Sequence, residues 1–385
     1  MIRRPPRSTL SPSSAASDVY KRQMLHSGAR YAVKDKEGAR ECIRETKILY
    51  EIAPHVLERT GGLFVALEED EKKWPDYKDK KIQGCKECGI PCEEITVREA
   101  LEIEPNLNPE ITSALWIPDD GALHPIPFVV SLCLSAMKYG ADIRPYNEVI
   151  EILKDGDTVT GVKVKDHLKN RIYEIKCDLV INAAGPWSGK VAAMAGVHVP
   201  VRPEPGVMVV INRRVVRHVI NHLRPTADGD IIVPEDTTAV IGTTSWPVED
   251  PDRVKIPREH VQLMIEEGIK KVPIIKQCRL IRAYVASRPL IAKEYAASGR
   301  DISRTFEAFD HEKVEGVAGF LTITGGKMCT ARGMAEKAID IACQKLGVRA
   351  PCRTHKEPLV GSEEPVNVEE LAREVGLIKM YAQYA

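Results

Sequence analysis

The stretch FLTITGGKMCT, residues 320–330, is the part of this sequence from which the rest of the fold can be worked out. Its first four residues are typical of a short buried strand, and Gly325 and Gly326 allow a sharp turn or a close approach to a ligand. A helix is expected after this turn, ending near Gly347. The predicted apolar face of that helix consists of Met334, Ala335, Ala338, Ile341 and Ala342.

The start of this helix is a candidate binding site for an anion. The first N–H groups of a helix have no partner within the helix, and the helix dipole adds about half a positive charge there. Phosphate is one ligand that such a site suits. An ordinary strand–turn–helix connection would have the same sequence pattern, so the other segments have to decide between the two interpretations.

The overall composition is that of a soluble globular protein. The chain has 385 residues, 43% hydrophobic and 29% charged, which leaves room for two domains of about 150 residues each. Lys and Arg together number 55, as do Asp and Glu, and this balance argues against bulk binding to nucleic acid or to an anionic membrane. No window approaches the ~18 apolar residues of a membrane-spanning helix. The ten cysteines show no disulfide-like spacing, which fits a reducing cytosol.

Residues 1–23 differ in character from the rest of the chain. They are rich in Arg, Pro and Ser and lack the apolar stretch of a secretory signal. The segment resembles translated sequencing adapter, and a disordered basic tail is the alternative. In both cases we expect it not to pack against the globular part.

Residues 24–31, with the sequence MLHSGARY, place His26, Arg30 and Tyr31 around Gly28. These side chains can bind an anion and handle a proton, although the motif alone is a weak signal. Further along the chain, Thr96 and Glu99 form a plausible capping box for a short helix. Longer helices are expected over residues 36–53, 71–87, 125–139 and 257–271.

Cys85, Cys88 and Cys92 are close enough in sequence to suggest a metal site. However, they straddle the expected helix end at Gly89, and no second Cys or His pair follows at the spacing of a zinc finger. We therefore predict no metal site.

Residues 178–187, with the sequence DLVINAAGPW, are typical of a buried strand that leads into a turn of small residues and then a helix. A dinucleotide-binding sheet presents this arrangement to its ligand, and a generic buried strand is the alternative. Antiparallel strands are expected within residues 148–176 and again within residues 199–309. Arg288 and Arg304 in the second region are either solvated charges or forked ligands for phosphate or carboxylate.

Six motifs occur in the order and at the spacing of FAD-dependent glycerol-3-phosphate dehydrogenases. They are HSGARY (26–31), NAAGPW (182–187), IGTTS (241–245), SRPL (287–290), ISR (302–304) and TGGK (324–327). The chain most resembles the A subunit of the anaerobic, three-subunit enzymes of this family. The resemblance runs from about Met24 to about Ser362.

The resemblance implies a mixed α/β fold, that of the glutathione-reductase-like flavoproteins of the D-amino-acid-oxidase family. The FAD-binding domain would be discontinuous and would consist of residues 24–60, 125–198 and 310–350. A substrate domain built on an antiparallel sheet would consist of residues 61–124 and 199–309. Residues 351–385 would begin a C-terminal region.

The resemblance also implies roles for individual residues. Arg288 and His26 would act in catalysis, with His26 a candidate proton acceptor by elimination only. The substrate would be bound by Arg30, Tyr31, Arg304, Thr243 and Lys327. Contacts to FAD would come from Ala184, Gly185, Trp187, Gly325, Gly326, Lys327 and Met328. A hydride would pass from C2 of sn-glycerol 3-phosphate to FAD, giving dihydroxyacetone phosphate, and the electrons would leave to quinone through partner subunits.

Three departures from the family pattern bear on these expectations. The sequence contains no GxGxxG turn for the FAD pyrophosphate, so we expect this chain to bind FAD poorly and, with a sheet strand missing, to be less stable. Single-subunit relatives carry a histidine near the substrate where this chain reads Gly206-Val207-Met208. The Cys-rich domain of the three-subunit enzymes is absent, so no iron–sulfur site is expected.

Two alternatives remain open. The chain could be an FAD-dependent oxidase or dehydrogenase of another small 2-hydroxy acid or amino acid, or a non-catalytic fragment. Convergence of the three arginines near the flavin would favour glycerol 3-phosphate. Under that hypothesis the protein would be cytoplasmic and held at the inner face of the cell membrane by partner subunits, without a transmembrane segment of its own.

Overall fold

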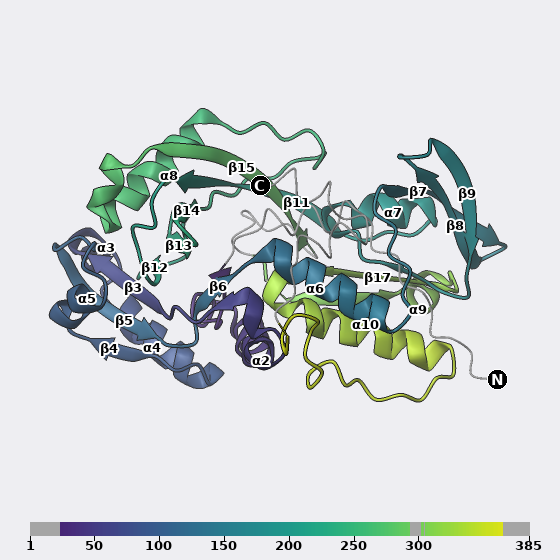
Figure 1. Cartoon of the computed structure of the whole chain (residues 1–385), viewed down its shortest axis with the longest axis horizontal. Helices are drawn as coiled ribbons and strands as arrows, with labels where there is room; N and C mark the ends of the chain where they lie inside the picture. Colours follow the sequence, from purple (N-terminus) through teal and green to yellow (C-terminus); the bar gives the residue numbers. More distant parts are fainter. Residues whose placement is uncertain (1–23, 293–301, 304, 365–385) are drawn as a thin grey trace.

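Eight strands form the large sheet of this protein, in a computed structural model that describes residues 24–292, 302–303 and 305–364. The strand order is β15-β11-β14-β13-β12-β3-β5-β4, and β12 and β3 are the parallel pair in an otherwise antiparallel sheet. The strands are β3 (Gly62–Leu67), β4 (Glu93–Ile95), β5 (Ile111–Ile117), β11 (Val201–Ile211), β12 (Val219–His222), β13 (Ile231–Glu235), β14 (Thr238–Gly242) and β15 (Leu280–Ile291). The sheet occupies one end of an elongated molecule (Figure 1).

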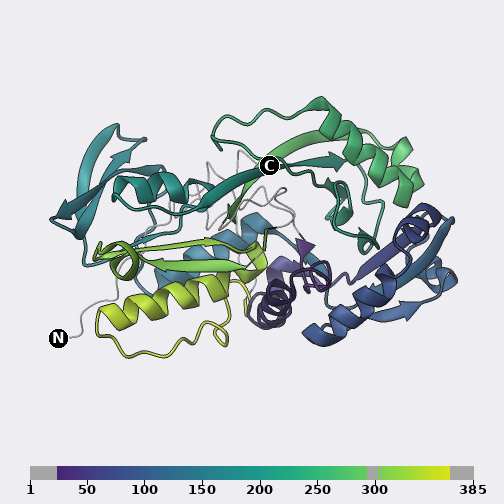
Figure 2. The ribbon, with the colours of Figure 1, turned by 180° about the vertical axis from the view of Figure 1, so that it is seen from behind.

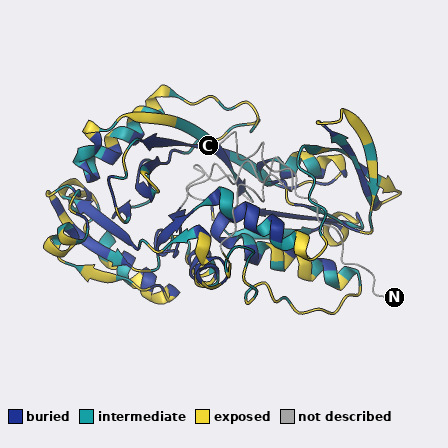
Figure 3. Ribbon diagram, viewed as in Figure 1, coloured by how far each residue is buried: buried dark blue, intermediate teal, exposed yellow. Residues whose placement is uncertain are grey.

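Alternate residues of these strands form the larger hydrophobic core. Val207, Val209 and Ile211 of β11 point to one face of the sheet, since side chains two apart in a strand share a face. Met264 of the covering helix α8 packs into the same cluster. The helices and 3₁₀ turn on this part of the chain are α3 (Glu68–Lys73), α4 (Tyr77–Cys88), α5 (Val97–Ile103), α8 (Arg258–Lys271) and η3 (Pro273–Gln277). Figure 3 shows the resulting contrast between buried strands and exposed helix surfaces.

A second sheet carries the glycine turn. Its strand order is β10-β17-β16, with β10 (Val180–Asn182) parallel and β16 (Phe306–Asp310) antiparallel to β17 (Phe320–Gly325). Helix α10 (Ala331–Lys345) follows β17 after the short turn η4 (Met328–Thr330) and runs back along the sheet (Figure 2). The remaining helices here are α2 (Lys36–Ile52), η1 (Pro54–Val56), α6 (Pro125–Lys138), η2 (Gly185–Trp187), α7 (Ser188–Met194) and α9 (His311–Glu315).

Two smaller sheets complete the described fold. An antiparallel meander consists of β7 (Asn147–Asp155), β8 (Thr158–Asp166) and β9 (Arg171–Lys176), as the sequence predicted. Its apolar side packs against α7 in a separate core cluster. The other sheet joins β1 (Met24–Leu25) and β2 (Leu57–Glu58) to opposite edges of β6 (Gly121–Leu123), and so places the residue 24–31 loop beside the large sheet.

Local sequence signals predicted most helix ends correctly. The capping box before α5 is confirmed, because Thr96 N donates to Glu99 Oε2 at 2.8 Å and Glu99 N donates to Thr96 Oγ1 at 3.2 Å. Gly89 ends α4 in the left-handed conformation expected of a helix C-terminus. None of the helices that the structure describes is both long and apolar enough to cross a membrane.

Two predictions about helices were wrong. The single charged helix expected over residues 71–87 is broken into α3 and α4 around Pro75, because a proline disfavours helical backbone at the residue before it. The expected apolar face of α10 is only partly correct, since Ala338 and Ala342 are buried but Ala335 is exposed. Arg332 is buried instead.

Candidate active site

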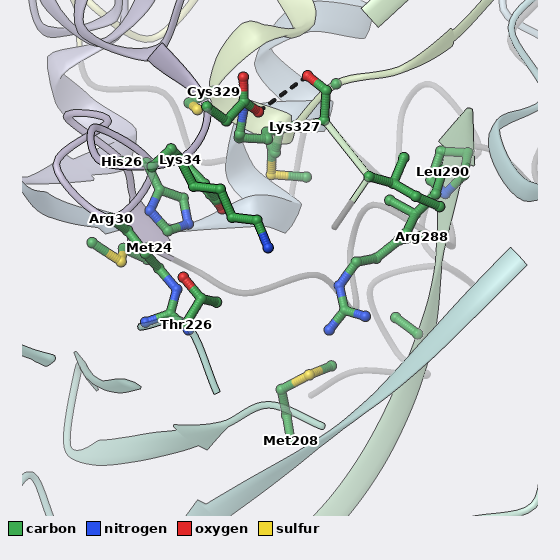
Figure 4. Close-up of a pocket in the computed structure, with 18 residues that line it drawn as sticks. Met24, His26, Arg30, Lys34, Met208, Thr226, Arg288, Leu290, Lys327 and Cys329 are labelled. Atoms are coloured by element: carbon green, nitrogen blue, oxygen red, sulfur yellow. Dashed lines mark hydrogen bonds between the residues drawn. The ribbon is translucent and has the colours of Figure 1, made fainter. Parts of the chain in front are cut away.

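A cavity of about 210 Å³ lies where the glycine turn, the residue 24–35 loop and the ends of β11 and β15 meet (Figure 4). Cations dominate the charged side chains that line it, with Asp35 as the acidic exception among the described lining residues. The basic lining residues are His26, Arg30, Lys34, Arg288 and Lys327. Gly326, Met328, Met208, Leu290 and Ile302 provide bare backbone and apolar surface.

The glycine turn gives the cavity a wall without side chains. Gly325 and Gly326 have φ angles of +85° and +65°, which other residues rarely adopt. A Cβ atom on Gly326 would lie only 2.6 Å from the sulfur of Met334. Any larger residue here would therefore strain the turn and close the approach to its backbone.

The N–H groups of this turn are used differently from the sequence-based expectation. Gly326 N donates to Thr305 O at 3.1 Å, and Lys327 N donates to Thr330 Oγ1 at 3.0 Å. These two N–H groups are thus bonded within the chain. The positive charge at this wall comes from the Lys327 side chain, whose ammonium lies 4.7 Å from the centre of the Tyr31 ring.

Lys327 is charged despite its burial. Burial by itself lowers the pKa of a lysine, but here the neighbouring Cys42, Tyr31 and Cys329 side chains and the Asp35 carboxyl outweigh that effect and raise the pKa of Lys327. The cavity therefore keeps this ammonium positive at neutral pH.

Arg30 is held by a buried carboxylate. Its Nη2 lies 2.7 Å from Asp230 Oδ2, and both side chains are almost fully buried. Arg224 donates to the other oxygen, Asp230 Oδ1, at 3.0 and 3.1 Å. Burial alone would raise the pKa of Asp230, but Arg30, His222 and Arg224 hold it well below its usual range. Asp230 is therefore a charged anchor between two arginines.

The loop that carries His26 and Arg30 is fixed along its whole length. Buried Lys81 donates to the carbonyl oxygens of Ala29 at 2.8 Å and Arg30 at 3.4 Å. Thr46 Oγ1 donates to His26 O at 2.8 Å. These contacts set the direction of the His26 ring, which faces Tyr31 with the ring centres 5.4 Å apart.

Arg288 lies on β15 opposite this loop, and hydrogen bonds to neutral oxygens orient it without cancelling its charge. Its Nη1 donates to Ser245 Oγ at 3.0 Å and to Glu204 O at 3.2 Å. Its Nη2 donates to Thr244 O at 2.9 Å and to Thr243 Oγ1 at 3.4 Å. In Figure 4 the guanidinium of Arg288 extends into the same space as the ammonium of Lys34.

Gly206 on β11 makes room for this guanidinium. A Cβ atom at Gly206 would lie 2.4 Å from Arg288 Nη2 and 2.3 Å from Thr243 Oγ1. We expect Gly206→Ala to displace Arg288 and to lower turnover about 100-fold, the usual effect of a misplacement near 1 Å. The measurement is the steady-state rate of the FAD-loaded protein with its substrate.

The matched control is Gly189→Ala in α7, where the nearest atom to an added Cβ is 3.6 Å away. This variant should retain wild-type turnover. Equal rates for Gly206→Ala and Gly189→Ala would show that Arg288 does not depend on the missing side chain.

Glu41 of α2 introduces a pH dependence beside Lys327. Its Oε2 is buried without a hydrogen-bond partner among the described residues, and burial raises the pKa of Glu41 to about 7, although Lys327 opposes the shift. Because the unfolded pKa is 4.5, the unfolded chain loses this proton first, so stability falls as pH rises from 4.5 to about 7. Glu41→Gln should therefore be more stable than wild type at pH 8 by about 1 kcal/mol, after discounting for partial exposure.

Thermal unfolding at pH 5 and pH 8 tests this expectation. The gain of Glu41→Gln should appear at pH 8 and be smaller at pH 5. Glu37→Gln, an exposed change one helical turn earlier, is the control and should show no such difference. The same gain at both pH values would contradict the assignment.

The structure brings together many, but not all, of the residues predicted for the site. His26, Arg30, Tyr31, Arg288, Gly326, Lys327 and Met328 line the one cavity. Thr243 lies behind Arg288 as its hydrogen-bond partner. Arg304 lies outside the described residues, so its predicted convergence with the other arginines stays a prediction.

The residues predicted around Gly185 lie apart from the cavity lining. Ala184 precedes η2, and Thr324 Oγ1 of β17 donates to Gly185 O at 3.5 Å, which places this turn beside the end of the central strand. Trp187 Nε1 donates to Asp252 Oδ1 at 2.7 Å. Contacts of Ala184, Gly185 and Trp187 with FAD therefore remain predictions.

Sequence reasoning missed several lining residues, among them Lys34, Met208 and Thr226. Lys34 follows directly on the HSGARY motif, so its position in the sequence was a usable signal. Thr226 reaches the cavity because Ala227 N donates to Asp230 Oδ2 at 2.7 Å and so shapes that turn. No sequence pattern announced this contact.

Comparison with known proteins places the chain among flavoproteins. A family profile described as FAD dependent oxidoreductase (DAO) matches residues 12–332. The A1 subunit of the anaerobic glycerol-3-phosphate dehydrogenase of Haloferax volcanii is 43% identical over 367 residues, covering 92% of this chain and 62% of that protein. The A subunit of the corresponding enzyme of Escherichia coli K12 is 41% identical over 347 residues, covering 90% of this chain and 63% of that protein. The chain thus spans about three fifths of the length of these relatives.

A solved structure shows the same fold. The glycerol-3-phosphate dehydrogenase of Bacillus halodurans, complexed with FAD, superimposes with a TM-score of 0.69 at 20% sequence identity. The similarity covers 98% of this chain and 67% of that one. At this identity the comparison supports the mixed α/β fold alone.

Proposed function

Because this chain belongs to the DAO family of FAD-dependent oxidoreductases, we propose that its cavity is the site of flavin-dependent oxidation of sn-glycerol 3-phosphate to dihydroxyacetone phosphate. The observation that carries the proposal is the gathering of Arg30, Lys34, Arg288 and Lys327 around one small cavity. A single carboxylate needs one such cation, whereas a phosphate with two negative charges uses several. The names of the relatives point to the same substrate.

The residues present fit the ring end of FAD. Gly326 offers bare backbone, and a side chain there would collide with Met334. Met328 adds apolar surface, and Lys327 adds a positive charge that suits a ring gaining negative charge. When bound, FAD supplies the two-electron acceptor. We propose Gly325, Gly326, Lys327 and Met328 as its contacts, with Ala184, Gly185 and Trp187 nearby.

The side chains of the chain itself would bind and orient the substrate. Arg30, fixed by Asp230, would hold the phosphate, with Lys34 beside it. Arg288 would hold the C2 oxygen, because its hydrogen bonds fix its guanidinium in one direction. His26 would accept the proton of the C2 hydroxyl, since an imidazole can act as a general base near neutral pH.

We further propose that the electrons leave through partner subunits to quinone. The support is that the relatives are named as subunits of a larger enzyme. Such partners would hold the protein at the inner face of the cell membrane.

The test of substrate class is a comparison of steady-state rates with an electron-accepting dye and the FAD-loaded protein. We expect glycerol 3-phosphate to be oxidised far faster than glycerol, small amino acids or 2-hydroxy acids without phosphate. A preferred substrate that carries only a carboxylate would favour the sibling oxidase, and a protein that binds FAD but oxidises none of them would favour a non-catalytic role.

A further inference from the structure

A second cluster of reactive side chains lies outside the cavity, where α10 meets the segment that follows it. Glu336 comes from α10, and Cys352 and His355 come from the residue 351–364 segment. One ligand atom of each, a carboxylate oxygen, a thiol sulfur and an imidazole nitrogen, lie within 4.8 Å of one another. All three residues are half-buried, so the cluster is shielded but reachable from solvent.

We propose that Glu336, Cys352 and His355 form a binding site for a borderline-soft divalent metal ion of the zinc class. Sulfur and imidazole nitrogen are the ligands that zinc prefers, whereas magnesium and calcium take oxygen. In tetrahedral zinc sites, metal–ligand distances near 2.0–2.3 Å put ligand atoms roughly 3.5 Å apart. Small side-chain movements bring these three atoms to that spacing, and the fourth position stays open to water.

The local backbone supports this arrangement. Lys356 N donates to Arg353 O at 2.9 Å, which closes a turn between Cys352 and His355. The turn bends the chain so that residues three apart in sequence face the same side. Cys352 Sγ also lies 3.2 Å from Thr354 Oγ1, which holds the thiol on the inner side of the turn.

The nearby Arg332 does not prevent cation binding. Its guanidinium makes two hydrogen bonds of 2.7 Å to the buried carboxylate of Glu45, so its charge is already balanced. It makes a further bond of 2.8 Å to Glu336 Oε2. Two carboxylates then face one guanidinium, which leaves a formal charge of −1 that a cation can neutralise.

Glu336 is available as a ligand in its charged form. Burial alone would raise the pKa of Glu336, but Arg332, Cys352 and His355 outweigh that effect and lower it. A carboxylate has two oxygens, so Glu336 can keep Arg332 on one and bind a metal ion with the other. The donor set is therefore complete at neutral pH once the thiol ionises on binding.

Metal binding would secure the residue 351–364 segment to α10. This segment already crosses two other helices, because Leu359 N donates to Ile52 O at 2.8 Å and Val360 N donates to Ser135 Oγ at 2.9 Å. A metal ion would add the third attachment. Helix α10 begins at the glycine turn of the cavity, so the site would stabilise the element that supports this turn.

The experiment is a titration of the reduced, metal-free protein with Co²⁺, followed by displacement with Zn²⁺. We expect a thiolate-to-cobalt charge-transfer band and the visible bands of tetrahedral cobalt, both removed by zinc. Cys352→Ser should abolish the charge-transfer band, and His355→Gln should weaken metal binding at least about 100-fold, at or beyond the effect of losing an outer-shell partner. Cys343→Ser, a change on α10 outside the cluster, should leave band and affinity unchanged.

Thermal unfolding with and without Zn²⁺ provides the second measurement. The wild type should gain stability on zinc addition, and His355→Gln should not, while both melt alike without metal. Failure to form the cobalt band, or a band that survives in Cys352→Ser, would overturn the proposal. Neither readout depends on catalytic activity, so the outcome is independent of the proposed function.

Discussion

Arg288→Lys is expected to lower kcat for glycerol 3-phosphate about 10²–10³-fold, the usual loss when one oriented donor to a developing charge is removed. Lysine keeps the charge but loses the planar fork, and it cannot bond simultaneously to Thr244 O, Ser245 Oγ and a substrate oxygen. Because Arg288 is assigned to the reacting C2 oxygen, kcat should fall more than KM rises. Steady-state kinetics of the FAD-loaded variant measure both.

The control for this change is Arg282→Lys. Arg282 lies on the same strand, β15, but is exposed and packs over the Tyr284 ring. Its replacement should leave kcat and KM near the wild-type values. If Arg288→Lys raised KM and left kcat unchanged, Arg288 would be a phosphate ligand and not a contact of the C2 oxygen.

Asp230→Asn is the second change with a large expected effect. The fully buried carboxylate neutralises Arg30 and Arg224, and the amide that replaces it carries no charge. Breaking a buried ion pair on one side costs about 3–5 kcal/mol, because the remaining charge is left uncompensated. We expect a markedly lower unfolding temperature and, since Arg30 loses its anchor, a higher KM for glycerol 3-phosphate.

The pH dependence of Asp230 has a definite sign. Its folded pKa lies below the unfolded value of 3.8, so its contribution to stability is present above that pH and is lost only as pH falls further. The destabilisation of Asp230→Asn should accordingly be constant from about pH 5 upward.

Asp236→Asn is the control for Asp230→Asn. Asp236 is exposed in the turn between β13 and β14, and its φ of +41° is tolerated by asparagine. This variant should unfold close to the wild-type temperature. If Asp230→Asn also did so, with KM unchanged, the ion pair would contribute neither to the fold nor to the cavity.

Features with a local cause could be predicted from the sequence. The glycine turn after β17, the capping box of α5 and the meander β7–β9 depend on residues close together in the chain. The break between α3 and α4 was also readable, because Pro75 is visible in the sequence, and it was overlooked.

Features that depend on distant residues could not be predicted in this way. Arg332 is buried in α10 because Glu45, far away in sequence, accepts its hydrogen bonds. Arg30 and Asp230 form the anchor of the cavity although 200 positions separate them. The motifs predicted that Arg30 and Arg288 belong to one site, but only the fold shows what holds each of them.

The central claim is that this cationic cavity presents glycerol 3-phosphate to a bound flavin. The most direct measurement is the visible spectrum of the FAD-loaded protein, recorded without oxygen before and after substrate is added. The account predicts that glycerol 3-phosphate bleaches the flavin band and that glycerol at the same concentration does not. A band that persists with glycerol 3-phosphate, or that glycerol bleaches equally well, would contradict it.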